Sequence, residues 1–85
     1  MKKDRLWWLS FCNEMTGSFL GVCLVEALDE DLAIRIAWKL EINPGGTVAM
    51  SPWPKEKPLP ADKWRHKLLS KDEVAEMERE LLSLS

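Results

Sequence analysis

The sequence has no tyrosine, two cysteines and one histidine among its 85 residues. Two cysteines are too few for the disulfide framework that stabilises many small extracellular domains. No stretch approaches the roughly 20 apolar residues of a membrane-spanning helix. The start "MKKDR" does not lead into a long apolar segment of the secretory type. We therefore expect a cytoplasmic protein with reduced thiols and no membrane partner.

The same scarcity argues against metal binding and catalysis. Neither a C-x-x-C nor an H-x-x-x-H spacing occurs, so a zinc site is not expected. His66 could pair with Cys12 or Cys23 as base and nucleophile, but both cysteines fall on strands expected to be buried, where a thiol is inert. The carboxylates at positions 29–31 are explained by helix capping. We expect no metal, no cofactor and no enzymatic activity.

The net charge and the tryptophan content indicate which kinds of partner the protein could bind. The net charge of −2 disfavours general binding to nucleic acid or to an anionic membrane, although residues 42–69 sum to +3 and residues 70–85 to −3. Tryptophan is abundant, with five residues. Each buried tryptophan removes roughly 150–250 Å² from water. The five rings therefore either build an aromatic core or include some that await a partner.

The segment "DRLWWLSFC", residues 4–12, predicts a strand that is apolar on both faces. Its alternate side chains are Leu6, Trp8 and Cys12 on one face, and Trp7, Leu9 and Phe11 on the other. Such a run is typical of a central strand covered on both sides. The segment "FLGVCLVEA", residues 19–27, predicts its antiparallel hairpin partner.

Two details of this hairpin depend on local geometry. The cysteines lie opposite each other if Gly17 and Ser18 form a two-residue turn, but not if the loop spans residues 13–18. Gly21, inside the second strand, indicates a bulge or the close approach of a large neighbour such as a tryptophan ring.

A helix is predicted to begin at the N-cap Asp29 and to run to about residue 40. Ile34 and Trp38 widen its apolar arc to roughly 240°, so this helix should be covered on more than one side. The segment "INPGG" predicts a type II turn with positive φ at Gly45. The segment "TVAMS" that follows predicts a third strand.

These elements predict an α+β fold. A right-handed crossover gives a three-stranded antiparallel or mixed sheet of order 2-1-3 in a ββαβ core over residues 1–51. A proline-rich connector over residues 52–61 and a C-terminal helical segment over residues 62–85 complete a single domain. Residues 61–69 could form a helical turn or two, and Ser70 with Glu73 forms a capping box that opens the last helix. Either that helix or another protein covers the second face of the sheet.

Residues 7–48 resemble short reading frames of bacteriophage and prophage genomes. The resemblance is carried by "WWLSF", "FLG", "VEA", "AW" and "INPGGTV". It implies a small accessory protein that binds a host or phage macromolecule, in some cases to block a defence or regulatory factor, and it assigns no catalytic residue. The pattern would place glycine at position 41, where this chain has Glu41. A left-handed helix end would be strained there, which favours a different ending.

The apolar excess favours a non-enzymatic protein-binding module, with a homodimer as one form. The candidate partner-binding residues are Trp53, Trp64, Ile34, Trp38, Met77 and Leu81. Trp53 lies between two prolines, and tryptophan is enriched among interface hot spots. Two alternatives are a structural homo-oligomer and a single-stranded nucleic-acid-binding protein, since rings interleave with cations over residues 53–71. The nucleic-acid candidates are Lys55, Lys57, Lys63, Arg65 and Lys67.

Overall fold

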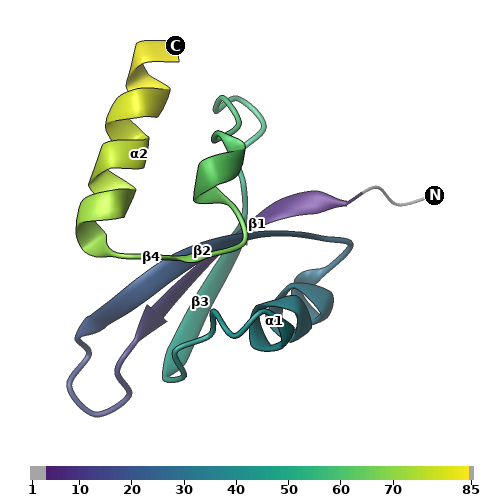
Figure 1. Ribbon diagram of the computed structural model, residues 1–85. Coiled ribbons are helices and arrows are strands. Elements are labelled where there is room, and N and C mark those ends of the chain that lie inside the picture. Colours follow the sequence, from purple (N-terminus) through teal and green to yellow (C-terminus); the bar gives the residue numbers. More distant parts are fainter. Residues whose placement is uncertain (1–3, 85) are drawn as a thin grey trace.

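The computed structural model describes residues 4–84 and shows the predicted α+β class (Figure 1). The parts of the predicted segments that fall on residues 1–3 and 85 lie outside the described residues. In chain order the elements are strands β1 (Arg5–Cys12) and β2 (Phe19–Ala27), helix α1 (Glu30–Lys39), strand β3 (Thr47–Pro52), the 3₁₀ helix η1 (Asp62–Trp64), strand β4 (Leu68–Leu69) and helix α2 (Lys71–Leu84).

The sheet has four antiparallel strands in the order β3-β1-β2-β4, so the predicted count of three is wrong. The three predicted strands do neighbour one another in the predicted order. The extra strand, β4, pairs with β2 at Val22 and Cys23. Residues 61–69, for which a helical turn or two was one possibility, contain the single turn η1 before this strand. A two-residue strand is too short to have a period that sequence patterns can reveal.

The two apolar faces of β1 belong to two separate cores, and a helix covers each face (Figure 1). The α1-side core contains Trp7, Leu9, Phe11, Cys23, Val25, Ala27, Ala33 and Ala37. The α2-side core contains Leu6, Val22, Leu24, Trp53, Trp64, Leu69, Met77 and Leu81. The second face of the sheet is therefore covered by the chain's own last helix together with two tryptophans that precede it.

Helix α1 begins as predicted and ends in a way that the sequence disfavours. The Asp29 side chain accepts a hydrogen bond from the Leu32 backbone N–H at 2.9 Å, as an N-cap should. At the other end, the Ile42 N–H donates to the Ala37 carbonyl and the Glu41 N–H to the Trp38 carbonyl. These two bonds define a Schellman motif, whose turning residue is left-handed. Glu41 takes that position with φ 60°, so the left-handed ending forms without the expected glycine.

The β1–β2 hairpin uses the longer of the two possible loops. Residues 13–18 form the turn, and Asn13 stabilises it by accepting the backbone N–H groups of Met15 and Thr16. The register pairs Cys12 with Phe19, so the two cysteines do not face each other. Both are free thiols.

Glycine is required where the chain passes close to its neighbours. The register of the hairpin shifts after Phe11, which confirms an irregularity at Gly21. The neighbour that approaches Gly21 is the Leu68 side chain of β4 and not a tryptophan ring. After α1, Gly45 has the predicted positive φ, 86°, and a Cβ on Gly46 would collide with the carbonyl oxygen of Cys12. These contacts fix the position at which β3 enters the sheet.

Candidate functional site

The structure places four of the six candidate partner-binding residues inside the α2-side core. Trp53 is 7% exposed and Trp64 is 4% exposed, while Met77 and Leu81 are equally buried. None of these four side chains is presented to a partner by the folded chain. The four side chains are buried because α2 packs against the sheet. Its Met77 and Leu81 enter the core, and the helix covers both indoles.

Trp53 fastens the connector to the body of the protein. Its indole N–H donates to the Pro58 carbonyl at 3.2 Å, so the connector loops back over the ring. The Lys57 ammonium lies 4.7 Å from the ring centroid, and Trp8 packs beside it with the two centroids 6.2 Å apart. The flanking prolines thus hold Trp53 inward, against its own domain.

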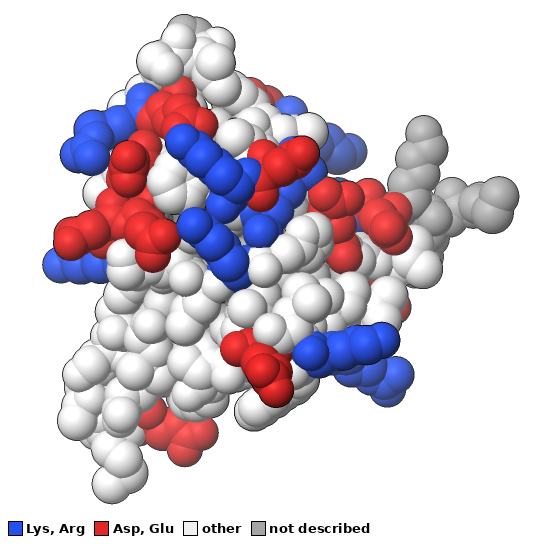
Figure 2. All heavy atoms as spheres, in the orientation of Figure 1, with Lys and Arg blue, Asp and Glu red and all other residues white. Residues whose placement is uncertain are grey.

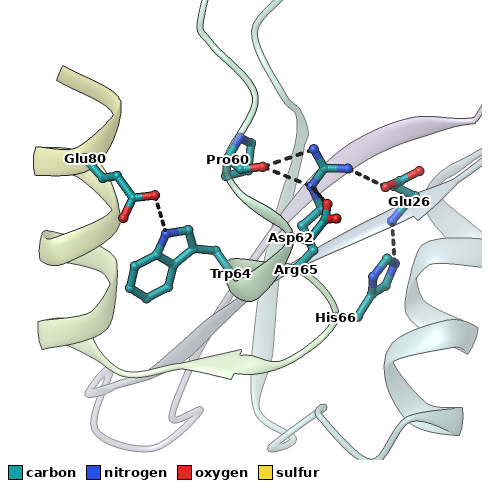
Figure 3. A network of polar contacts seen from close by, with 7 residues as sticks. All are labelled: Glu26, Pro60, Asp62, Trp64, Arg65, His66 and Glu80. Carbon is teal, nitrogen blue, oxygen red and sulfur yellow. Dashed lines mark hydrogen bonds and ion pairs between the residues drawn. The ribbon is translucent and has the colours of Figure 1, made fainter. Parts of the chain in front are cut away.

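Trp64 links α2 to the chain that precedes it, residues 53–70, and from here on we use the name connector for this whole segment. Its indole N–H donates to Glu80 Oε1 at 3.3 Å (Figure 3). The ammonium groups of Lys63 and Lys67 lie 4.8 and 5.5 Å from its ring centroid, within the range of a cation–π contact. The ring therefore packs between the sheet, two cations and a carboxylate of α2.

Three ion pairs join the basic connector to the acidic last helix. They are Lys57–Glu78 at 3.0 Å, Lys63–Glu80 at 3.1 Å and Lys67–Glu73 at 3.4 Å. The predicted capping box also forms, since Ser70 and Glu73 exchange hydrogen bonds between side chain and backbone N–H at 3.1 and 3.2 Å. The opposite charges of the two segments are thus used within the domain.

The electrostatics of α2 follow from these contacts. The hydrogen bond from the Ser70 backbone, with help from Lys67, lowers the pKa of Glu73. The hydrogen bond from Lys63, with a smaller one from Trp64, lowers the pKa of Glu80. Both carboxylates are partly exposed, so each contact is individually weak. Together they set the position of α2 along the connector.

The remaining basic residue of this region, Arg65, is held by the chain itself (Figure 3). Its guanidinium donates to Glu26 at 2.6 Å and, through two nitrogens, to the Pro60 carbonyl at 3.0 and 3.2 Å. Asp62 lies 3.9 Å away. Of the five nucleic-acid candidates, only Lys55 makes no ion pair with another residue in the range 4–84. The two indoles of this region are buried, while the paired Lys63 and Lys67 side chains stay 61% and 45% exposed.

His66 and Cys23 are each engaged by the fold. The His66 Nε2 atom accepts the Glu26 backbone N–H at 3.3 Å, and its own backbone N–H donates to the Leu24 carbonyl. Burial raises the pKa of the Cys23 thiol to about 12. Cys23 therefore stays protonated at neutral pH, and His66 serves to secure the last turn of the connector against β2.

An open hollow lies beside the start of α1. It is lined by Asp4, Arg5, Trp7, Leu28, Asp29, Glu30, Asp31 and Lys55. The Trp7 indole N–H is already engaged, because it donates to the Ala27 carbonyl at 3.0 Å. Across residues 4–84, no three His, Cys, Asp or Glu side chains converge in a way that could hold a metal ion. The carboxylates of residues 29–31 act on the helix, through the Asp29 cap and the charge of the first turn.

Large exposed apolar side chains are spread over the surface, at Met15, Leu59, Leu82 and Leu84 as well as on α1. Trp38 is 60% exposed, and Ile34, one turn earlier, is half-buried against the α1-side core. Val48 and Met50 of β3 pack against the same core. We call Ile34, Trp38 and strand β3 the α1–β3 face.

The α1–β3 face adjoins a part of the molecule with few charges. Residues 42–54 contain no charged side chain. Figure 2 shows charged residues over α2, the connector and α1, while the surface over β3 and the hairpin is largely uncharged. The sequence analysis identified Ile34 and Trp38 but missed the β3 edge. The uncharged run 42–54 is the signal that could have revealed it.

Comparison with protein-family models, curated proteins and solved structures finds no match to this chain. None of the helices within residues 4–84 has both the length and the apolar character needed to cross a membrane.

Proposed function

We propose that this protein is a small non-enzymatic protein-binding module that docks through its α1–β3 face. The observation that carries the proposal is Trp38, a tryptophan of α1 left 60% exposed, while the other four tryptophans are buried or partly buried. Ile34, one turn earlier on α1, packs on the same core as Val48 and Met50 of the uncharged edge strand. Tryptophan is among the residues most enriched at interface hot spots. Three lysines that precede α2, by contrast, form ion pairs with carboxylates of that helix.

The partner class follows from the chemistry of the face. Aliphatic and indole groups with few charges suit an apolar protein surface and not a polyanion. The resemblance to phage reading frames supports a host or phage protein as the partner, with the chain acting as an accessory factor. Binding alone would then block or redirect that partner.

The proposal is tested by capture from a bacterial host lysate with tagged wild-type protein and two variants. Trp38→Ala removes the exposed ring of the α1–β3 face. Leu59→Ala is the matched control, because Leu59 on the connector is 61% exposed. We expect Trp38→Ala, but not Leu59→Ala, to lower recovery of a specific protein by about tenfold, the loss typical of a moderate hot spot. Equal recovery with both variants would contradict the assignment of this face.

A further inference from the structure

The free edge of β3 presents backbone groups that have no neighbour in the sheet. The Trp53 N–H donates to the Leu6 carbonyl of β1 at 2.8 Å. In an antiparallel ladder, alternate residues direct both their N–H and C=O to the same neighbour. Counting back along β3 in steps of two, Ala49 also faces β1. The intervening Val48 and Met50 therefore direct their N–H and C=O groups outward.

This edge lacks the usual protection against pairing. Strand β3 ends the sheet, and within residues 4–84 no further strand pairs with it. Natural edge strands are commonly blocked by a lysine, a bulge or a covering segment. Strand β3 carries no charged residue, and its only blocking feature is Pro52 at its last position. The opposite edge of the sheet, β4, has only two residues and leads directly into α2.

The outward N–H and C=O groups of this edge can pair with another extended strand. A second copy of β3 is such a strand, and its residues are complementary to those of the first. If two β3 strands run antiparallel with Val48 opposite Met50 of the second copy, their outward groups exchange hydrogen bonds at both symmetry-related pairs. Ala49 then lies opposite Ala49 of the second copy, and Thr47 opposite Ser51. Each cross-strand pair therefore joins side chains of the same type: small with small, hydroxyl with hydroxyl, and aliphatic with aliphatic.

The charge distribution agrees with the same occupant. Two copies of an uncharged edge approach without like-charge repulsion, and the uncharged run extends from residue 42 to residue 54 on each side. With a two-fold axis at Ala49, each β3 edge is paired with the other. The free edges of the combined sheet are then the two short β4 strands. The contact is therefore closed at two copies and does not continue into a filament.

We propose that β3 pairs antiparallel with β3 of a second copy, with Val48 opposite Met50, and joins two sheets of four strands into one of eight. This inference goes beyond the proposed function, because it assigns the backbone edge of β3 to a second copy and leaves Trp38 to the partner protein. The dimer is the form in which the chain would present Trp38, twice, to any further partner.

The test introduces a charge at the two-fold axis. Ala49 is exposed, and its Cβ would lie about 4.5–5.5 Å from that of Ala49 in the second copy. Sedimentation equilibrium should show the wild-type chain at twice its 9.8 kDa mass at high concentration. Ala49→Lys should raise the dimer dissociation constant by at least about tenfold. Ala75→Lys, at an exposed alanine of α2, is the matched control and should leave it unchanged.

Two further measurements fix the register. Ala49→Glu alone should also raise the dimer dissociation constant, and mixing it with Ala49→Lys should give a mixed dimer that is tighter than either variant dimer. In a Cys12→Ser background, Ala49→Cys should form a disulfide-linked dimer under mild oxidation, while Thr47→Cys should not. A wild-type chain that stays monomeric at its highest soluble concentration would overturn the proposal. So would a dimer that Ala49→Lys leaves intact.

These outcomes are separable from those of the lysate capture. A monomeric chain that still loses a captured protein on Trp38→Ala contradicts β3 self-pairing and retains the binding function. A dimer abolished by Ala49→Lys, with capture unaffected by Trp38→Ala, contradicts the function proposed for the ring and retains the pairing.

Discussion

At the scale of single residues, the structure holds two non-glycine residues in the left-handed region, Glu41 at φ 60° and His66 at φ 58°. This conformation costs roughly 1–2 kcal/mol for a residue with a Cβ. At His66 the cost is offset by the backbone bond to Leu24 and by the imidazole bond from Glu26. At Glu41 only the backbone bonds of the Schellman motif act, and the side chain is exposed.

Glu41→Gly should therefore stabilise the protein. Relief of the left-handed strain exceeds the extra entropy that glycine gives the unfolded chain, so we expect a gain of about 1 kcal/mol in the free energy of unfolding. The measurement is urea denaturation followed by far-UV circular dichroism. Lys39→Gly, two residues earlier and inside α1, is the control and should lose about 0.5–1 kcal/mol. A loss of stability in Glu41→Gly would show that the Glu41 side chain contributes to the helix end.

At the scale of elements, α2 is positioned by polar contacts at its edge and by two buried side chains beneath it. Glu73, Glu78 and Glu80 pair with connector lysines, while Met77 and Leu81 enter the α2-side core. The apolar contacts supply most of the stability, because exposed ion pairs each contribute little. The ion pairs select the register in which the helix lies against the connector.

The stability of this arrangement should fall in acid. The pKa values of Glu73 and Glu80 lie below their usual value of 4.5 in the folded state. Their contribution is thus complete above that pH and is lost as the pH falls through the lowered folded values. We expect the urea midpoint to decrease below about pH 5, and to decrease less steeply in Glu80→Gln, which cannot titrate. Glu76→Gln, on the same helix but without an ion pair among the described residues, should keep the wild-type slope. Equal slopes in all three proteins would rule out this role of Glu80.

At the scale of the whole molecule, local signals in the sequence were sufficient where a contact spans a few residues. The Asp29 cap, the box of Ser70 with Glu73, and the positive φ of Gly45 all depend on near neighbours, and all three form as predicted. The two-faced β1 also required a second covering layer, which the structure supplies. Sequence patterns could not show whether this layer comes from the same chain or from a partner. The reason is that a row of apolar residues has the same pattern in a core as at an interface.

Trp53 and Trp64 illustrate that ambiguity, and their energetics distinguish the two cases. Since both rings lie in the α2-side core, Trp64→Ala should lower the free energy of unfolding by about 3–5 kcal/mol, through lost burial and the cavity that remains. That is a large share of the ~5–15 kcal/mol typical of a small domain. The more conservative Trp64→Phe should lose less, which keeps the effect measurable if the alanine variant fails to fold.

Trp38→Ala is the counterpart on the exposed face and should change stability by less than about 1 kcal/mol. Urea denaturation of the three variants, followed by circular dichroism at equal protein concentration, makes the comparison. Equal concentration matters because a dimer through β3 adds a concentration-dependent term to every midpoint. If Trp64→Ala were as stable as Trp38→Ala, α2 would not enclose Trp64 in solution. The second face of the sheet would then be open to a partner protein.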